Sequence, residues 1–319
     1  MAHFDNKIEP LVSVVVITYN SAKTVIETLE SIRSQTYRNL ELIISDDCST
    51  DDTIVIVNEW LKGNDTQFVY SELLTTDKNT GVSGNLNRGV LRSHGEWIKS
   101  IAGDDLLVPE AIDEYVKFVK NHADKVKMCI SDVELFSTDG LIPGALKRDY
   151  SHFFEMANES YEEQRIRVMS QLVFVGPSYY YSRELFDEVG GFSEEYGCAE
   201  EWPFVYKVIC GGNRIYAIDK KLIKYRFSQK SLSHNKNNKG VRNIALDLSS
   251  CKFFFDYPFH DLLRSHHYLI AWDRYLFFRT CQVYYESKEA LWAFGLMKLS
   301  SLLSPYAYLN RLKIIKKMI

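Results

Sequence analysis

Apolar residues in the first 131 positions follow two alternating patterns. Short, mostly apolar runs have the length of strands buried on both faces of a sheet, at residues 11–17, 40–45, 68–71, 97–102 and 126–131. Between them, apolar residues recur at helical spacing, at residues 21–35, 53–61, 83–93 and 109–120. This alternation predicts an α/β fold with a mostly parallel central sheet and helices on both faces.

The second half has a less regular pattern. Helices are predicted at residues 165–174, 183–189 and 199–208, and extended segments at 177–181, 214–218 and 222–227. Residues 139–164 form a long polar connection, a type of segment that is usually functional. The last ~75 residues show a helical apolar stripe and end in a basic amphipathic piece, residues 309–319. We therefore divide the chain into an α/β domain, residues 1–240, and a C-terminal helical region, residues 241–319.

Composition restricts the classes of protein to which the chain can belong. The formal net charge is −4, whereas a general nucleic-acid binder usually carries a basic excess, so we expect no nucleic-acid partner. The six cysteines are scattered and include no Cys-x-x-Cys pair, which favours reduced thiols in a cytoplasmic protein. The first residues lack the apolar segment of a signal peptide, and no apolar run approaches the ~20 residues that span a bilayer.

Three pairs of acidic residues stand where loops are expected. Asp46-Asp47 and Asp104-Asp105 each follow a predicted strand, and Glu200-Glu201 stand where a helix begins. Parallel strands end at a common edge where open α/β sheets bind ligands, so we expect the two Asp pairs to share that edge. Oxygen-rich clusters suit Mg²⁺ or Mn²⁺, which can stabilise a departing diphosphate. The plain alternatives are a solvated Asp-Asp turn and acids favoured by a helix dipole.

The glycine-rich motifs of other phosphate-handling proteins are missing from the sequence. It contains no G-x-x-x-x-G-K-[ST] loop, and no G-x-G-x-x-G follows the first predicted strand. Kinase, ATPase and classical dehydrogenase functions are therefore excluded.

Several motifs, in this order, resemble those of family 2 glycosyltransferases with the GT-A fold, in the style of bacterial O-antigen and capsule enzymes. Gly103-Asp104-Asp105 takes the place of the family's Asp-x-Asp (DXD) signature. The other matching pieces are residues 12–20, ending in Thr-Tyr-Asn; Ser34-Gln35-Thr36-Tyr37; residues 42–51; and Gly190-Gly191-Phe192 followed by Glu200-Glu201-Trp202. The resemblance covers roughly residues 11–230. It implies a GT-A domain that binds a nucleotide-sugar.

The resemblance implies a nucleoside site at the end of the first two strands. Asp47, with Asp46 beside it, is similar to the acid that hydrogen-bonds the uracil ring of a UDP-sugar. Tyr19 would pack against the base, or it is a plain aromatic that closes the sheet edge. The surrounding segment, Thr18 and Asn20 included, would touch the nucleoside.

The resemblance also implies how the diphosphate and a metal ion are held. Asp104 would bind the ribose or the sugar and share the ion with Asp105, the metal ligand. The family often carries an Arg where this chain has Leu86, and Arg88 would replace it as a phosphate or base contact, or is an ordinary solvated helix residue. The family's later His is missing, which leaves His234 as the nearby candidate for a third ligand.

Glu201 aligns with the family's general base, and Glu200 is its orienting neighbour. The implied reaction is an inverting, Mn²⁺- or Mg²⁺-dependent transfer of a hexose or N-acetylhexosamine from a UDP-sugar. The acceptor would be a hydroxyl of a lipid-linked oligosaccharide in surface polysaccharide biosynthesis. Because the base must take the proton of that hydroxyl, its loss typically costs ~10²–10⁴ in rate.

Three alternatives remain open. The first is a sugar-phosphate nucleotidyltransferase, which needs a Gly-rich, Arg/Lys-bearing loop after the first strand that the sequence does not supply. The second is a glycoside hydrolase, which would cleave sugar chains without nucleotide or metal. A non-catalytic sugar-nucleotide-binding or assembly subunit would bind UDP without needing Glu201. For the C-terminal helices we expect a cap or a homodimer contact, and for the last dozen residues a peripheral contact with the inner face of the cell membrane.

Overall fold

The computed structural model describes residues 9–122, 125–137, 159–171, 176–197, 199–227, 244–288 and 291–302. The strands are β1 (Val12–Thr18), β2 (Leu40–Asp46), β3 (Tyr70–Leu74), β4 (Trp97–Ala102), β5 (Leu106–Leu107), β6 (Met128–Phe136), β7 (Tyr180–Ser182) and β8 (Tyr216–Arg226). The helices before the C-terminal region are α1 (Val25–Arg33), α2 (Thr53–Asn64), α3 (Gly81–Arg92), α4 (Ala111–Asn121), α6 (Tyr161–Ser170), α7 (Arg183–Val189) and α8 (Glu201–Cys210). Helices α9 (Ile244–Asp256), α10 (Pro258–Arg264), α11 (Tyr268–Glu286) and α12 (Leu291–Leu302) follow, and the short 3-10 turns are η1 (Asp65–Gln67), η3 (Gly176–Ser178) and η4 (Glu194–Tyr196).

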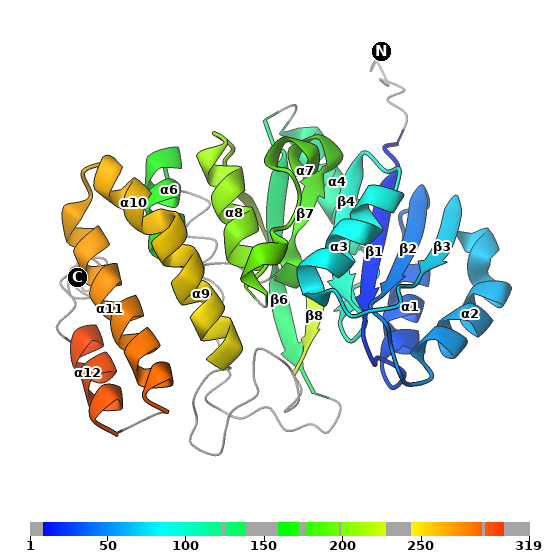
Figure 1. Cartoon of the computed structure of the whole chain (residues 1–319). Helices are drawn as coiled ribbons and strands as arrows, with labels where there is room; N and C mark the ends of the chain where they lie inside the picture. The colour runs from blue at the N-terminus through cyan, green and yellow to red at the C-terminus, as the bar shows by residue number, and fades with distance from the viewer. Residues whose placement is uncertain are drawn as a thin grey trace, which may run out of the picture.

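The strands form a sheet in the order β3-β2-β1-β4-β7-β6-β8-β5, and its first four strands are parallel (Figure 1). Residues 12 and 14–16 of β1 are 0% exposed, which explains why this strand is a continuous apolar run. In the pairing of β1 with its neighbours, Thr18 lies opposite Asp46, and Ile17 lies opposite Ala102. The three strands therefore end at one level, and the two Asp pairs follow them at the same edge, as expected.

The second half of the sheet is mixed. Strand β7 is antiparallel to both β4 and β6, β5 is antiparallel to β8, and β6 is parallel to β8. The two strands predicted at 214–218 and 222–227 are one strand, β8, so that prediction is wrong. The polar residues 219–221 between the two predicted strands are exposed. The pairing of β8 with β6 continues across them because the register shifts at Asp132 of β6.

Helices cover both faces of the sheet, and each face has its own core. Val14 and Val16 pack with α1, α2 and α4, whereas Val15 between them packs with α3, α7 and α8. Successive strand residues point to opposite faces, so a strand buried on both sides contributes to both cores. The expected α/β fold with helices on both faces is confirmed.

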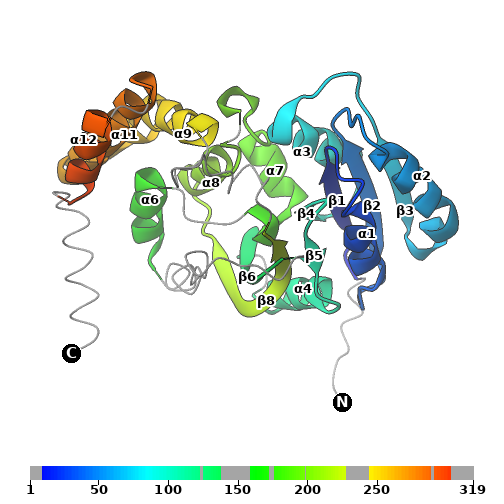
Figure 2. The same ribbon diagram turned by 90° about the horizontal axis from the view of Figure 1, so that it is seen from below.

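The C-terminal helices α9 to α11 lie beside α6 and α8, away from strands β1 to β3, in both views (Figures 1 and 2). Aromatic side chains make this junction: the ring centroid of Trp202 in α8 lies 5.2 Å from that of Phe253 in α9 and 5.6 Å from that of Phe278 in α11. The expected C-terminal helical part is confirmed. Among the described residues, no helix has both the length and the apolar character that crossing a bilayer requires.

Candidate functional site

Thr18, at the end of β1, lies next to both Asp pairs. Its side-chain hydroxyl donates a 2.7 Å hydrogen bond to Asp46, and its carbonyl accepts 2.9 Å and 3.1 Å bonds from the backbone of Asp47 and the amide of Asn85. A Cβ on Gly103 would collide with the Thr18 methyl group. The turn that carries Asp104 and Asp105 is therefore packed directly against the end of β1.

Asp46 and Asp47 are buried, and both organise the surrounding loops. The Asp46 carboxylate accepts hydrogen bonds from the backbone and hydroxyl of Ser49 as well as from Thr18. The Asp47 carboxylate accepts bonds from the first residues of α3, namely 3.0 Å and 2.6 Å from the backbone and hydroxyl of Thr80 and 2.8 Å from the backbone of Gly81. Because helix N-termini present unpaired N–H groups, an acid there is well placed to order α3.

Arg88 contacts Asp47 from the side of α3. Its guanidinium lies 3.2 Å from the Asp47 carboxylate and also donates to the Asn85 side chain, the Ser45 hydroxyl and the Asp46 carbonyl. Arg88 is therefore not an ordinary solvated helix residue: the structure places it against Asp47.

The loops above Asp46 and Asp47 carry the exposed candidates. The Tyr19 side chain is 51% exposed, so it does not close the sheet edge as a core residue. Asn20 and Cys48 have positive φ values of 52° and 68°, which are uncommon for residues other than glycine and cluster at functional sites. The Asn20 amide fixes this shape by accepting a 2.8 Å bond from the backbone of Thr50.

Arg226, at the end of β8, holds the Asp104-Asp105 pair. Its backbone N–H donates 2.8 Å to the Asp105 carboxylate, and its side chain donates 2.6 Å to the Asp104 carbonyl and 2.8 Å to Glu27. Burial raises the pKa of both acids, and the neighbouring Asp104 carboxylate raises the pKa of Asp105 further. Sequence reasoning did not select Arg226, because its partners lie far from it in the chain and leave no motif around it.

The acid pair fits part of a divalent-cation site. One oxygen of Asp105 is buried and has no hydrogen-bond partner among the described residues, so it is free to bind a cation. Carboxylate oxygens suit Mg²⁺ and Mn²⁺, and such ions usually keep waters and substrate phosphates as further ligands. The part of the chain that the structure describes contains no group of three or more His, Cys, Asp or Glu that would hold an ion alone, and His234 lies outside the described residues.

Glu200 and Glu201 begin α8. The backbone of Gly176 in η3 donates a 2.7 Å hydrogen bond to Oε1 of Glu201, whereas Oε2 of Glu200 is buried and has no partner in the part of the chain that the structure describes. Burial raises the pKa of Glu201 to about 7, and burial together with the neighbouring Glu201 raises the pKa of Glu200 to about 8. A carboxyl group with a pKa near neutral pH is well matched to general-base catalysis.

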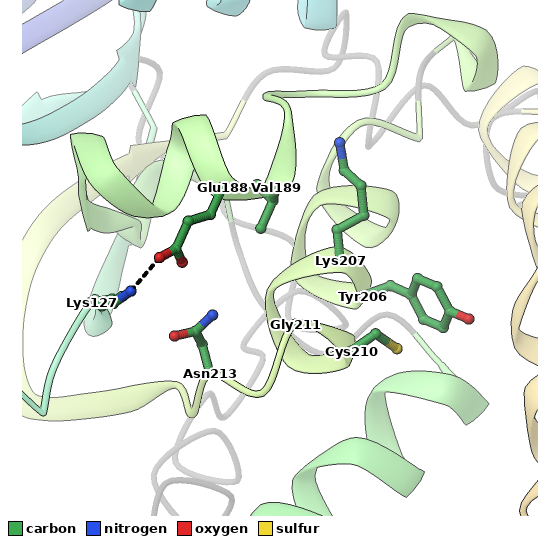
Figure 3. A pocket seen from close by; sticks show the side chains of 8 residues that line it. All are labelled: Lys127, Glu188, Val189, Tyr206, Lys207, Cys210, Gly211 and Asn213. Atoms are coloured by element: carbon green, nitrogen blue, oxygen red, sulfur yellow. Dashed lines mark hydrogen bonds and ion pairs between the residues drawn. The ribbon is translucent and has the colours of Figure 1, made fainter.

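A separate cleft of about 570 Å³ lies at the other end of α8, between α7 and α8 (Figure 3). Its lining residues are Lys127, Glu188, Val189, Tyr206, Lys207, Cys210, Gly211 and Asn213. Lys127 and Glu188 form an ion pair of 2.5 Å within it. None of the acidic candidates lines this cleft, so it is distinct from the site at the sheet edge.

Comparison with known proteins places the sequence in a family. The model of "Glycosyl transferase family 2" matches residues 13–190. Glycosyltransferase EpsE of Bacillus subtilis is 34% identical over 113 residues, which are 35% of this chain and 40% of that protein. The Escherichia coli protein WfaP, a UDP-Glc:alpha-D-GlcNAc-diphosphoundecaprenol beta-1,3-glucosyltransferase, is 34% identical over 110 residues, 34% of this chain and 41% of that protein. The matched region thus spans about two fifths of each relative.

Solved structures share the fold. Staphylococcus aureus TarS in complex with UDP-GlcNAc superposes with a TM-score of 0.62 at 20% identity, over 91% of this chain and 79% of that one. The mannosyltransferase PcManGT from Pyrobaculum calidifontis, in complex with GDP-Man and Mn²⁺, gives a TM-score of 0.58 at 18% identity, over 93% of this chain and 81% of that one. The family match covers more than half of the chain. This protein is therefore a family 2 glycosyltransferase with the GT-A fold.

Proposed function

We propose that this glycosyltransferase transfers a hexose or N-acetylhexosamine from a UDP-sugar to a hydroxyl of a lipid-linked oligosaccharide, with inversion at the anomeric carbon. The single observation that carries the proposal is the sharing of one sheet edge by Asp46-Asp47 and Asp104-Asp105, at the ends of strands β2 and β4 that flank β1. The relatives in polysaccharide biosynthesis support the acceptor class, because WfaP is named for a diphosphoundecaprenol acceptor.

In the proposed donor site, the base of the nucleotide lies between exposed Tyr19 and Asp47. Asp47 already accepts bonds from Thr80, Gly81 and Arg88, so a uracil N–H reaching it meets a carboxylate whose position is fixed. Asp104 and Asp105 would hold Mn²⁺ or Mg²⁺, which supplies Lewis-acid stabilisation of the leaving diphosphate when bound. The buried, unpartnered Asp105 oxygen supports this assignment.

Glu201 is the proposed base. As the acceptor oxygen bonds to the anomeric carbon, the bond from that carbon to the diphosphate breaks, and the hydroxyl proton moves to Glu201. Its Oε1 is held by Gly176, which leaves Oε2 to receive the proton. Glu200, with the more raised pKa, is proposed to stay protonated and thereby to limit the repulsion between the two neighbouring groups.

We also propose that the C-terminal region contacts the inner surface of the cell membrane, where a lipid-linked acceptor is found. Residues 309–319, for which the sequence predicts this contact, lie outside the described residues, and the proposal extends the contact to α11 and α12, in place of a cap or dimer contact. Trp272 and Trp292 are both 60% exposed and Leu291 is 89% exposed. Tryptophan and leucine on exposed amphipathic helices favour the membrane interface. Residues 258–319 contain nine Lys or Arg and four Asp or Glu, although the whole chain has a net charge of −4. The division into a GT-A domain, residues 1–240, and a C-terminal helical region, residues 241–319, is part of the same proposal.

The experiment is an assay of UDP release with Mn²⁺ over a panel of UDP-sugars and a lipid-linked or synthetic pyrophosphate-lipid acceptor. We expect release with one donor, loss of release on removal of the metal, and a decrease of ~10²–10⁴ in Glu201→Gln. Glu59→Gln, at an exposed position of α2, is the matched control. If the protein binds UDP-sugars but Glu201→Gln has no effect on UDP release, the chain is a binding subunit instead. If the protein neither binds nor cleaves any UDP-sugar of the panel, the proposed donor is excluded.

A further inference from the structure

Residues 176–179 form a short segment between the proposed base, Glu201, and the sheet. We call this segment the strap. The strap begins with η3 and leads into β7, and its 3-10 turn is closed by a 3.0 Å bond from the backbone of Tyr179 to the carbonyl of Gly176. At its start, the Gly176 N–H contacts Glu201, and a Cβ at this position would collide with the Glu201 carboxylate. The position of the strap therefore sets the position of that carboxylate.

Buried side chains hold the strap from the opposite side. Lys99, on β4, is 0% exposed, and its ammonium group donates to the carbonyl of Pro177 and, at 3.1 Å, to the carbonyl of Tyr179. The Tyr115 hydroxyl, from α4, donates 3.0 Å to the carbonyl of Ser178 between them. Three consecutive carbonyl groups of the strap are thus fixed by side chains from the sheet and from a helix.

An amine in this place is costly for the fold. Lys99 stands in a strand whose neighbours Ile98 and Ile101 are core residues, and burial lowers its pKa to about 7. The charge of Asp105 opposes this shift. A buried ammonium group is unfavourable unless its hydrogen bonds are satisfied, and a methionine of similar length would fill the same space without that cost. Two of the three hydrogen bonds that Lys99 makes reach the strap, and the third reaches Ser100 at 3.0 Å.

We propose that Lys99 is a positioning residue for the reaction, which acts by fixing the strap and through it the Gly176 N–H that orients Glu201. The proposal rests on the proposed role of Glu201 as the base. Lys99 also lies on the strand that leads into Asp104 and Asp105. One strand thereby fixes the base and the acid pair relative to each other, although they are about a hundred residues apart in sequence.

The test is Lys99→Met, with Lys127→Met as a control that removes an amine from surface ion pairs with Glu184 and Glu188. In Lys99→Met we expect kcat to fall about 10- to 100-fold with little change in the KM of the donor, since a misplaced catalytic group loses rate at that scale. The bond from Gly176 lowers the pKa of Glu201. Its loss moves the midpoint of the kcat–pH profile upward from about pH 7, the pKa of Glu201.

The titratable neighbours of Glu201 are unchanged by the substitution. Glu200 precedes it in the chain, and Tyr179 faces both acids from the strap with a buried hydroxyl that has no partner in the described structure. The charge of Lys99 also lowers the pKa of Asp105, so the profile is measured at saturating Mn²⁺. A shift in Lys99→Met that is absent from Lys127→Met reports the position of Glu201 when it is shared by a variant that leaves this charge in place. Tyr115→Phe removes the hydroxyl that donates to the Ser178 carbonyl of the strap, and it should shift the midpoint of the kcat–pH profile upward by a smaller amount.

Amide hydrogen exchange of peptides covering residues 176–182 gives a readout that does not need activity. Faster exchange in Lys99→Met than in Lys127→Met, together with the shifted profile, supports the proposal. Unchanged exchange overturns it, and so does faster exchange with an unshifted profile, which would mean a structural role alone. If wild type and Glu201→Gln release UDP equally, the function proposed for Glu201 fails, while the exchange data still show whether Lys99 holds the strap.

Discussion

The backbone N–H of Arg226 donates a 2.8 Å hydrogen bond to the carboxylate of Asp105, which lies 121 residues earlier in the chain. The guanidinium group of the same arginine is buried and donates to the Asp104 carbonyl and to Glu27. The end of β8 thus fixes the Asp105 carboxylate and the backbone of the Gly-Asp-Asp turn. Groups that orient a metal's ligands commonly change its affinity 10- to 100-fold when they are removed.

Arg226→Met should therefore raise the Mn²⁺ concentration needed for half-maximal UDP release by about 10- to 100-fold. The substitution removes the side-chain bonds but leaves the backbone bond to Asp105, so saturating Mn²⁺ should restore most of the rate. Arg92→Met, which removes an exposed arginine paired with Glu72, is the control and should leave the Mn²⁺ dependence unchanged. An identical Mn²⁺ dependence in the two variants would contradict the role assigned to Arg226.

Glu200→Gln should make the protein more stable at alkaline pH. Burial raises the pKa of Glu200 from its ordinary value of 4.5 to about 8. Between these two pH values the folded state therefore holds a proton that the unfolded state has lost. Stability consequently falls as pH rises through this window. Thermal unfolding measures the Tm of both proteins. We expect the Tm difference between Glu200→Gln and wild type to be more in favour of the variant at pH 8.5 than at pH 5. A difference that does not vary with pH would show that the pKa of Glu200 is the same in the folded and unfolded states.

Much of the sheet edge could be predicted from the sequence because its determinants are local. A strand such as β1, with 0% exposure along most of its length, must be a continuous apolar run, and parallel strands must end at one edge. These two rules are enough to bring Asp47 and Asp105 to the same side of the sheet. The role of Arg88 against Asp47 follows less directly, because nothing in helical spacing distinguishes it from a solvated arginine.

Contacts between distant segments could not be read from the sequence. Gly176 reaches Glu201 only because β7 inserts antiparallel beside β4, and a three-residue strand shows no periodicity that announces its direction. Strand β8 continues through exposed charged residues, which resemble a loop in the sequence. Lys99 did leave a signal, since a lysine inside an otherwise apolar strand is unexpected, but its partners are backbone carbonyls that carry no sequence signature.

Gly176→Ala should lower activity without preventing folding. An added Cβ would overlap the Glu201 carboxylate, and the base has to move away from its N–H partner. We expect kcat to fall at least about tenfold with the KM of the donor little changed, measured by UDP release. Gly63→Ala is the control, because no atom lies within 4 Å of a Cβ at this position of α2. Equal activity of both variants would show that the contact with Gly176 does not position Glu201.

The exposed face of α11 and α12 should bind anionic membranes. Trp272 and Trp292 are partly exposed aromatic residues of the kind that settle at the lipid interface, and the C-terminal basic excess is attracted to acidic headgroups. We expect sedimentation with phosphatidylglycerol vesicles, a decrease of that binding at high salt, and weak binding to phosphatidylcholine vesicles. A Trp272→Ser, Trp292→Ser double variant should lose roughly tenfold or more of the binding.

Leu91→Ser is the matched control for this double variant, because Leu91 is 71% exposed on α3 in the opposite part of the chain. Its vesicle binding should equal that of wild type. This result would show that binding depends on the face of α11 and α12 and is not lost when an exposed apolar side chain is removed elsewhere. If the double variant still binds vesicles normally but loses a dimer seen by sedimentation velocity, the face contacts a second copy of the chain. The acceptor lipid would then have to reach Glu201 from another side, and the membrane proposal for α11 and α12 would be wrong.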